Sequence, residues 1–405
     1  MSKGHVRGSD VRGVGRLAVD ATLGLTRLVE TVHHNILRTP GIFGSATQEP
    51  AKGLTGLVYR TIRGVTRLVG GGVDALLGQL SPLVGEGIVS SPEREAVLAG
   101  LNGVLGDRLA AQSNPLAIAL RLRRGGVPLT LSRAALARDV PAAGGRILVL
   151  LHGLCMSDLQ WLRRGHDHGA ALERDEGFCA VHVHFNSGLH VSQNGRELSR
   201  QLEALVHAWP VEVTELAMLG YSMGGLVARS ACQHAAADNS AWMRCLRRIV
   251  FLGTPHFGAP LERGGNWIDR ILDSSPYTTA FSRLGKLRSA GITDLRHGSL
   301  CDADWQSRDR FARSDERPAA VPLPSGVRCH AIAASVAKKR SPLREKAVGD
   351  GLVPLASALG KDADPARSLA IDKADQWVGY GMNHLDLLDR EDAYAQIRRW
   401  LASAA

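Results

Sequence analysis

Aromatic residues, long apolar runs and patterned cysteines are all scarce in this sequence of 405 residues. Aromatic side chains make up only 5% of it, which argues against the stacking platforms that bind single-stranded nucleic acid. No stretch approaches the roughly 18 charge-free apolar residues of a transmembrane helix, so none is predicted. The first ten residues lack an apolar run and a cleavage motif, which argues against a secretory signal. The expected location is the cytoplasm, with peripheral contact with a membrane or lipid surface as the alternative.

The 6 cysteines are widely spaced and fit neither a zinc-binding pattern nor a small disulfide scaffold. Several lie in apolar patterns, which favours buried free thiols, and Cys301 with Cys329 is the pair to test for a bridge. The net charge is +10, but its arginines are scattered and form no compact basic tract with interleaved aromatics. We therefore expect no nucleic-acid partner, no metal and no cofactor, and at most a weak attraction to an anionic lipid surface.

The N-terminal part of the chain carries helical patterns. Apolar residues recur every three or four positions over residues 11–37 and again over residues 54–80, which predicts two amphipathic helices. These helices either pack as a hairpin on the rest of the protein or lie in a lipid interface, with Arg60, Arg63 and Arg67 at the head groups. Helical patterns over 92–109 and 115–124 complete a predicted N-terminal helical extension, residues 1–125.

From residue 126 onward, buried strand patterns alternate with helical ones. The predicted strands cover residues 127–131, 146–151, 178–185, 216–219, 248–252 and 327–333, and the clearest helices cover 195–208 and 390–401. This alternation predicts an α/β fold, a mostly parallel sheet with helices on both faces. The strand pattern stops between residues 257 and 324, where helical pieces at 267–272 and 279–287 suggest an inserted lid or cap.

The strongest local motif is Gly220-Tyr221-Ser222-Met223-Gly224-Gly225. An apolar strand pattern runs into it and a helical pattern follows it, which is the context of a nucleophile elbow. In a chain with 45 glycines this motif can arise by chance. The strand pattern before it and the helical pattern after it are what indicate a nucleophile elbow. Ser222 is the candidate nucleophile, and the Met223 N–H at the helix start is a candidate donor to an oxyanion.

A serine nucleophile needs a base and a group that orients the base. Asp350, in Gly349-Asp350-Gly351, and His384 follow Ser222 in the chain order found in α/β-hydrolases. Asp364 and Asp372 are the alternative carboxylates. His256 is expected to be structural, His152 to brace the loop that it begins, and Asp386 to cap a helix.

Together, these motifs resemble those of the α/β-hydrolase superfamily, most closely bacterial triacylglycerol lipases and related deacylases with a Gly-Thr-Pro-His element. The motifs that carry the resemblance are His152-Gly153-Leu154, the Ser222 elbow, Gly253-Thr254-Pro255-His256-Phe257-Gly258, Asp350-Gly351-Leu352-Val353 and Asn383-His384. The resemblance covers residues 127–405 and implies an α/β-hydrolase fold. It also implies that Ser222, His384 and Asp350 form a catalytic triad and that the N–H groups of Leu154 and Met223 bind the oxyanion.

The expected function is that of a serine hydrolase that cleaves carboxylic esters, with a lipid or acyl-chain ester as substrate. An acyltransferase or a thioesterase would use the same triad. A third possibility is a membrane-binding or protein-binding module in which the N-terminal helices act and the triad is vestigial.

Overall fold

The computed structural model describes residues 9, 12, 13, 15, 16, 92–259, 289–306, 318, 320–338 and 349–402. The chain divides into two compact units. The first comprises residues 1–88 and 111–116, and its described contacts include the hydrogen bond from Arg16 to the Ser113 carbonyl. The second comprises residues 89–110 and 117–405, and the sheet and the candidate site described below belong to it.

An 8-stranded sheet forms the centre of this second unit, with the strand order β2-β1-β4-β3-β5-β6-β7-β8. Neighbouring strands from β4 to β8 run parallel, whereas β1 is antiparallel to both β2 and β4. The strands are β1 (Arg121–Arg124), β2 (Val127–Pro128), β3 (Arg146–Leu151), β4 (Cys179–His184), β5 (Glu215–Tyr221), β6 (Leu246–Leu252), β7 (Arg328–Ser335) and β8 (Gln376–Tyr380).

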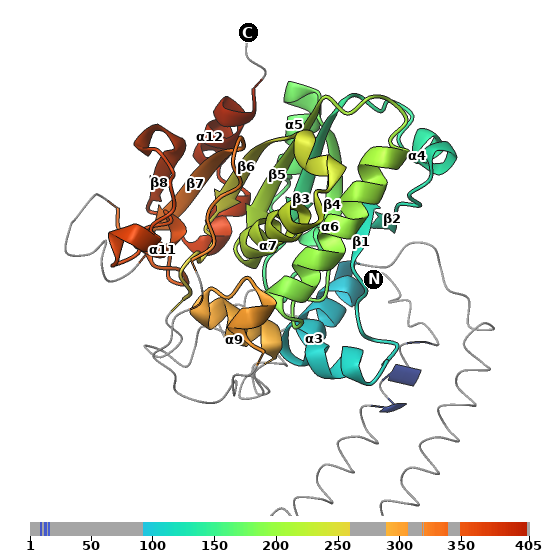
Figure 1. The fold of residues 1–405 in the computed structure, drawn as a ribbon, viewed down its shortest axis with the longest axis horizontal. Coiled ribbons are helices and arrows are strands. Elements are labelled where there is room, and N and C mark those ends of the chain that lie inside the picture. The colour runs from blue at the N-terminus through green and yellow to red at the C-terminus, as the bar shows by residue number, and fades with distance from the viewer. Residues whose placement is uncertain are drawn as a thin grey trace, which may run out of the picture. The chain divides into compact units, whose positions relative to one another are not determined.

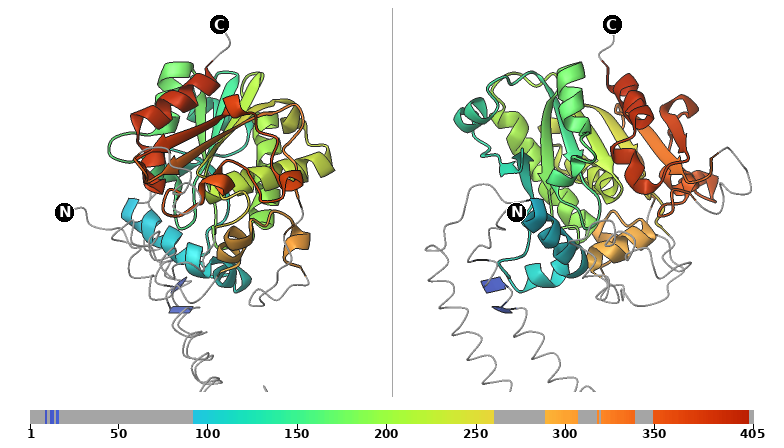
Figure 2. Two further views of the ribbon diagram at one scale, coloured as in Figure 1. Left: turned by 90° about the vertical axis from the view of Figure 1, so that its left-hand side faces the viewer. Right: turned by 180° about the vertical axis from the view of Figure 1, so that it is seen from behind.

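Helices cover both faces of the sheet (Figures 1 and 2). Alternate residues of a strand point to opposite faces, so the apolar run of β3 supplies two cores. Ile147 and Val149 pack with residues of α6 (Val191–Ala208) and α7 (Met223–Asp238), whereas Leu148 and Leu150 pack with residues of α5 (His168–Glu176) and α12 (Glu391–Leu401). The mostly parallel sheet with helices on both faces confirms the predicted fold class. The other α-helices described in this unit are α3 (Pro92–Ala111), α4 (Arg133–Asp139), α9 (Ala290–His297) and α11 (Leu355–Ala358).

The helix predicted over residues 115–124 is wrong. Residues 115–120 are not helical, and Arg121–Arg124 form β1, which pairs with β4. Gly125 and Gly126 both have positive φ, +56° and +78°, and turn the chain back into β2. The apolar spacing of this segment resembles that of a helix, but the pairing with β4 and the two glycines decide its conformation. Strand β8 has no counterpart among the predicted strands.

Buried charges join α3 to the sheet. Arg123 of β1 donates hydrogen bonds to Glu95 of α3 at 2.9 Å and to Asp158 at 2.8 Å. Burial opposes the charge on Arg123, but Asp158 and Glu95 raise its pKa above the ordinary value. The guanidinium therefore bridges two carboxylates that would be costly to bury alone. Ligand atoms of Glu95, Asp158 and His184 lie within 4.8 Å of one another, but a metal ion there would have to displace the Arg123 cation.

Several sequence-based expectations fall outside the described residues. They are the two amphipathic N-terminal helices, apart from residues 12, 13, 15 and 16, and the helical pieces at 267–272 and 279–287 of the expected lid. The domain boundary at residue 126 stays a prediction. All 6 cysteines are free, and Cys155, Cys179, Cys232 and Cys329 are buried. Among the described helices, none is both long and apolar enough to cross a membrane.

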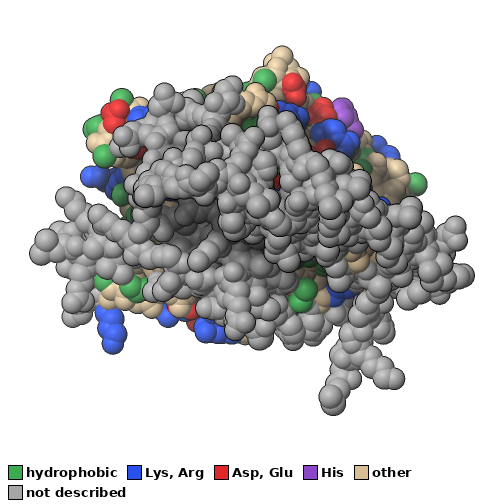
Figure 3. Space-filling model, turned by 90° about the horizontal axis from the view of Figure 1, so that it is seen from below, with side chains coloured by type: hydrophobic (Ala, Val, Ile, Leu, Met, Phe, Trp, Pro, Cys, Tyr) green, Lys and Arg blue, Asp and Glu red, His purple; other side chains and the backbone are tan. Residues whose placement is uncertain are grey.

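Basic side chains are interspersed with other types on the face of the molecule shown in Figure 3. Where described side chains are visible there, Lys and Arg lie among acidic and hydrophobic groups. Many of the described arginines are also paired with carboxylates, including Arg146 with Glu215 and Arg398 with Glu176. Such pairing reduces the positive electrostatic field with which these arginines could attract an anionic surface.

Candidate functional site

Ser222 lies between the end of β5 and the start of α7, in a conformation that non-glycine residues rarely adopt. Its φ is +53° and its ψ is −120°, and its side chain is buried. A left-handed backbone of this kind costs a non-glycine residue on the order of 1–3 kcal/mol. The Ser222 N–H donates to the Leu252 carbonyl of the neighbouring strand β6 at 2.8 Å, which fixes the turn to the sheet.

The glycines of the elbow allow strand and helix to approach each other. A Cβ atom at Gly220 would lie 2.6 Å from the Gly225 Cα, and one at Gly224 would lie 2.3 Å from the Leu151 carbonyl oxygen. A Cβ at Gly225 would lie 2.0 Å from the hydroxyl of Thr254. None of these contacts is possible for a side chain, so the strained turn at Ser222 depends on glycine at all three positions.

Leu154 and Met223, the predicted oxyanion donors, lie on two segments that meet beside Ser222. Met223 is the first residue of α7, and the first N–H groups of a helix have no acceptor within it. Leu154 follows Gly153, where a Cβ would lie 3.2 Å from the Cβ of Ser222. The loop after β3 is thus in contact with the elbow, and the role of Leu154 and Met223 as oxyanion donors stays a prediction.

His384 and Asp350 form a buried pair. His384 Nδ1 lies 2.6 Å from Asp350 Oδ2, and the other carboxylate oxygen accepts the N–H groups of Leu352 at 2.9 Å and Val353 at 2.7 Å. The His384 N–H donates to the Asp350 carbonyl at 3.2 Å. The Asp350 carboxylate therefore accepts two backbone N–H groups and faces His384 Nδ1. The tautomer that donates from Nδ1 to Asp350 has a lone pair on Nε2.

The His384 ring lies against residues next to Ser222. Its centroid is 4.9 Å from that of Tyr221, whose hydroxyl donates to the His384 carbonyl at 3.3 Å. On another side, a Cβ at Gly253 would lie 2.9 Å from His384 Cε1. The Nε2 atom is buried and has no hydrogen-bond partner among the described residues. Ser222 follows β5, Asp350 follows β7 and His384 follows β8, and the His384 ring lies beside Tyr221 and the turn at Gly253.

A buried histidine of α5 supports the segment that carries His384. His168 Nε2 lies 2.9 Å from the carbonyl of Leu387, which belongs to the same 3₁₀ helix (His384–Leu388). His168 Nδ1 lies 2.8 Å from His166 Nε2. Burial lowers the pKa of His168 to about 4, so the ring is neutral near pH 7 and donates its one N–H to Leu387.

His152 braces the loop after β3, as expected. Its Nε2 accepts the Phe185 N–H at 3.3 Å, and its ring stacks on Phe185 with centroids 4.1 Å apart. Burial lowers the pKa of His152 to about 3. A ring that stays neutral and has its Nε2 occupied is suited to support rather than to proton transfer.

His256 also has a structural environment. Its Nδ1 lies 3.3 Å from an Arg229 nitrogen, so the guanidinium donates to it, and its ring meets Phe251 edge to face. Burial and the neighbouring Arg229 lower the pKa of His256 well below its ordinary value. Arg229 also donates to the Val321 carbonyl at 2.5 Å, so the pair ties α7 to two loops.

The alternative acids have local roles. Asp364 accepts the Ala366 N–H at 3.0 Å at the start of a short 3₁₀ helix, and Asp372 precedes another. Asp386 forms a capping box with Asn383, with reciprocal bonds of 3.0 and 3.1 Å, as the capping interpretation expected. Of these carboxylates and Asp350, only Asp350 is hydrogen-bonded to His384 among the described contacts.

Two helices lie at this end of the sheet (Figures 1 and 2): α3, which the sequence analysis placed in an N-terminal extension, and α9, which lies within the segment 257–324 predicted as a lid or cap. Ser289 donates from its hydroxyl to the Gly103 carbonyl of α3 at 2.7 Å, and the Ala290 N–H donates to Asp107 at 3.1 Å. A Cβ at Gly291 would lie 3.0 Å from the Met223 side chain. Glycines recur at every third position in α3, at Gly100, Gly103 and Gly106. This spacing could have predicted the close packing from the sequence.

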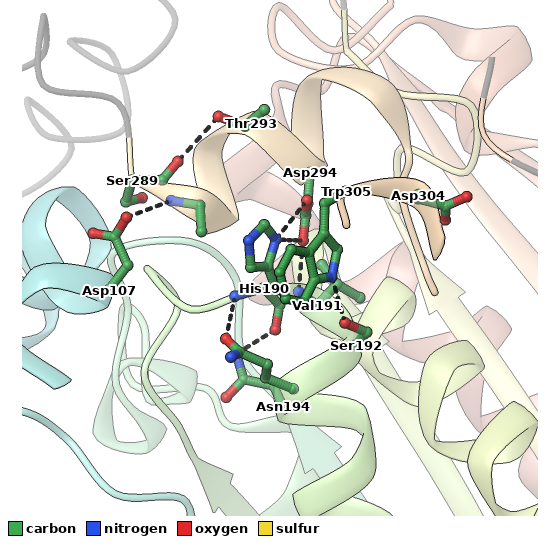
Figure 4. A network of polar contacts seen from close by, with 12 residues as sticks. Asp107, His190, Val191, Ser192, Asn194, Ser289, Thr293, Asp294, Asp304 and Trp305 are labelled. Atoms are coloured by element: carbon green, nitrogen blue, oxygen red, sulfur yellow. Dashed lines mark hydrogen bonds and ion pairs between the residues drawn. The ribbon is translucent and has the colours of Figure 1, made fainter. Parts of the chain in front are cut away.

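Helix α9 is also fastened to the start of α6. Figure 4 shows Asp294 turned toward His190 and Val191, with Trp305 against the imidazole. His190 Nδ1 lies 3.0 Å from both Asp294 oxygens, and the Val191 N–H donates to one of them at 2.8 Å. The Trp305 ring stacks on His190 at 3.8 Å and donates to Ser192 at 3.0 Å. This network fixes α9 relative to α6 and so to Met223.

Comparisons with known proteins found one family model and several solved structures. A family model described as a domain of unknown function (DUF7379) matches residues 129–296. No match to a curated protein was found. The mature lipase BlEst2 of Bacillus licheniformis is 16% identical, with 64% of this chain and 92% of that chain covered and a TM-score of 0.42.

Two further solved structures resemble the chain at a similar level. The type II thioesterase YbtT of yersiniabactin biosynthesis is 16% identical, with 64% of this chain and 93% of that chain covered and a TM-score of 0.38. The esterase Pf2001 of Pyrococcus furiosus is 13% identical, with 64% and 81% covered and a TM-score of 0.38. These TM-scores are low, so the chemistry of the site rests on its own geometry.

Replacing Gly253 by alanine should displace His384. Gly253 and Gly177 both have positive φ, +58° and +67°, so alanine should lower the free energy of unfolding by about 1–2 kcal/mol at either position. Only at Gly253 would the new Cβ meet the His384 ring, because nothing lies within 4 Å of a Cβ at Gly177. We expect Gly253→Ala to slow fluorophosphonate labelling of Ser222 at least tenfold and Gly177→Ala to leave it unchanged. Equal labelling rates in the two variants would contradict this placement of His384.

Three fully buried histidines should make the fold sensitive to acid. The folded-state pKa is about 3 for His152, about 4 for His168 and well below the ordinary value for His256. The unfolded chain binds these protons near pH 6.5, whereas the folded protein does not until the pH is much lower. Stability is therefore fully present above about pH 6.5 and falls as the pH decreases toward 4, by up to about 1.4 kcal/mol per pH unit for each group.

Urea unfolding at pH 7, 6 and 5 measures this dependence. His168→Gln should reduce the slope of unfolding free energy against pH by about 1 kcal/mol per unit, since one such group is removed. His207→Gln is the control, because the His207 side chain is 68% exposed. A slope in His168→Gln that equals that of the unsubstituted protein would contradict the neutral, buried state of His168.

Proposed function

We propose that the protein is a serine hydrolase that cleaves carboxylic esters through an acyl-enzyme. The observation that carries the proposal is the His384–Asp350 pair at 2.6 Å, whose free Nε2 is buried in the described structure. The His384 ring packs against Tyr221, the residue before the strained Ser222. A nucleophile, a base and a group that orients the base are thus held by three different strand ends, as acyl transfer requires.

In the first half of the proposed reaction, Ser222 Oγ attacks the ester carbonyl carbon and its proton passes to His384 Nε2. The carbonyl oxygen becomes an oxyanion, and the N–H groups of Leu154 and Met223 bind it. Preorganised donors of this kind are worth on the order of 3 kcal/mol each in the transition state. His384 then gives the proton to the departing alcohol oxygen as the C–O bond breaks, which leaves the acyl group on Ser222.

In the second half, water replaces the alcohol. His384 takes a proton from the water as it attacks the acyl carbon, and returns that proton to Ser222 Oγ when the acid is released. Asp350 stays ionised throughout and stabilises the imidazolium, while its two backbone hydrogen bonds hold its position. No step requires a metal or a cofactor.

An acyl-chain ester, including a lipid ester, is the substrate class that we propose. The motif set supports it, and so does the apolar character of the two residues whose N–H groups bind the oxyanion. Leu154 and Met223 are buried and belong to the same apolar cluster as Cys155 and Ile292. An apolar surround of this kind favours an acyl chain over a charged substrate.

A fluorophosphonate probe tests the nucleophile. The probe should label the unsubstituted protein and fail to label Ser222→Ala, because the phosphorus atom bonds only to an activated serine oxygen. Ser230→Ala is the matched control, since Ser230 is a buried serine of the same helix and its hydroxyl donates to the Leu300 carbonyl. Labelling of Ser222→Ala at the normal rate would remove the basis of the proposal.

A series of p-nitrophenyl esters, measured with and without a lipid interface, tests the substrate class. If the site binds an acyl chain, kcat/KM should rise with chain length by roughly three- to fourfold per added methylene, up to the length that the site accommodates. The same assays with an added alcohol acceptor distinguish hydrolysis from acyl transfer. A kcat/KM that is flat from acetate to longer esters would argue against an acyl-chain substrate.

A further inference from the structure

The residue after the proposed oxyanion donor Leu154 has a strained backbone. Cys155 has a φ of +59°, in the left-handed region that side chains disfavour, and it is 3% exposed. For a non-glycine residue this conformation is disfavoured roughly five- to thirtyfold. Surrounding contacts must therefore hold it, because a relaxed Cys155 would turn the adjoining Leu154 peptide away from its present direction.

Ser187 supplies one such contact. Its hydroxyl oxygen accepts the Cys155 N–H at 3.0 Å, and the Ser187 side chain is 1% exposed. Ser187 lies just beyond the end of β4, so the bond joins two separate loops at the carboxyl edge of the sheet. A buried N–H that lost this acceptor would be left without a partner, which is costly in itself.

Helix α3 supplies the second contact. A Cβ atom at Gly103 would lie 2.2 Å from the sulfur of Cys155, so the helix backbone rests directly on that side chain. Three residues later, a Cβ at Gly106 would lie 1.9 Å from the Asn186 amide oxygen, and the Asn186 amide nitrogen donates to the Gly106 carbonyl at 3.0 Å. One turn of α3 thus contacts both Cys155 and the residue before Ser187.

The segment 186–188 is itself fixed from three directions. The Asn194 side chain of α6 donates to the Asn186 carbonyl at 2.9 Å, and the Gly188 N–H donates to the Asn186 side chain at 3.0 Å. From α9, the Gly291 N–H donates to the Gly188 carbonyl at 3.1 Å. The acceptor oxygen of Ser187 is therefore held on a segment that α3, α6 and α9 all contact.

We propose that Ser187 is a positioning residue for the oxyanion site: its hydroxyl holds Cys155 in the left-handed conformation and thereby fixes the direction of the Leu154 N–H. The proposal rests on the function proposed above. Ser187 acts through the loop, so its removal should weaken transition-state binding and leave the binding of the ester ground state intact.

Three variants measured against one control test this role. We expect Ser187→Ala to lower kcat by roughly ten- to hundredfold with KM changed less than twofold, and to slow fluorophosphonate labelling in parallel. Cys155→Gly alone should lower kcat less than Ser187→Ala does, because glycine adopts this φ without strain although the contact between the sulfur and Gly103 is lost. The double variant, with both Ser187→Ala and Cys155→Gly, should have a kcat at least fivefold higher than that of Ser187→Ala, because a loop with glycine at position 155 has no backbone strain to release.

Ser199→Ala is the control for loss of a buried serine hydroxyl. Ser199 is 3% exposed and accepts the Trp242 indole N–H at 3.2 Å on α6, so its removal should lower stability and leave kcat unchanged. If Ser187→Ala does not fold, Ser187→Cys takes its place, because the thiol has similar size and is a weaker acceptor.

Each outcome separates this inference from the proposed function. If the unsubstituted protein is labelled at Ser222 but Ser187→Ala has normal kcat, the positioning role is wrong and the proposed function stands. Failure of both Ser187 variants to fold, or a double variant no more active than Ser187→Ala, would also overturn the role. Absence of labelling in the unsubstituted protein would overturn the proposed function itself.

Discussion

The rest of the site depends on one strained turn. Ser222 can hold a φ of +53° only because Gly220, Gly224 and Gly225 let β5, α7 and the loop after β3 come within contact distances that no side chain would allow. The same approach brings Gly153 against Ser222 and so carries Leu154 to the elbow. Strain at Ser222 and closeness of the loop after β3 are therefore two results of a single packing arrangement.

Sequence reasoning predicted the parts of this arrangement that depend on the residues of a single short segment. Strand β3 was predicted with its observed limits because a fully buried parallel strand is an unbroken apolar run. The elbow was predicted because its glycines are required by backbone geometry next to Ser222. The Asp350–His384 contact was anticipated from chain order and resemblance alone, and the structure supplies its 2.6 Å separation.

The remaining features depend on pairings between distant residues. Segment 121–124 was predicted to be helical, yet it forms a strand because it pairs with β4, about which its own residues give no information. The position of α3 was missed for the same reason. The need for glycine at position 103 becomes clear only from the contact between α3 and the Cys155 side chain. Ser187 belongs to no motif, and its acceptor role depends on a loop 32 positions earlier in the chain.

The polar atoms of the site are held by backbone groups, and this makes the site a consequence of strand register. Ser222 is fixed through Leu252, and Tyr221 is paired with Leu252 in the β5–β6 ladder. Leu252 pairs in turn with Ile332, whose carbonyl accepts the N–H of Gly253, the glycine that contacts His384. A slip of one residue in either ladder would reverse the faces of the apolar side chains and separate His384 from Ser222. The two apolar cores on the faces of the sheet, which oppose such a slip, are thus what keeps Ser222 and His384, the proposed nucleophile and base, in register.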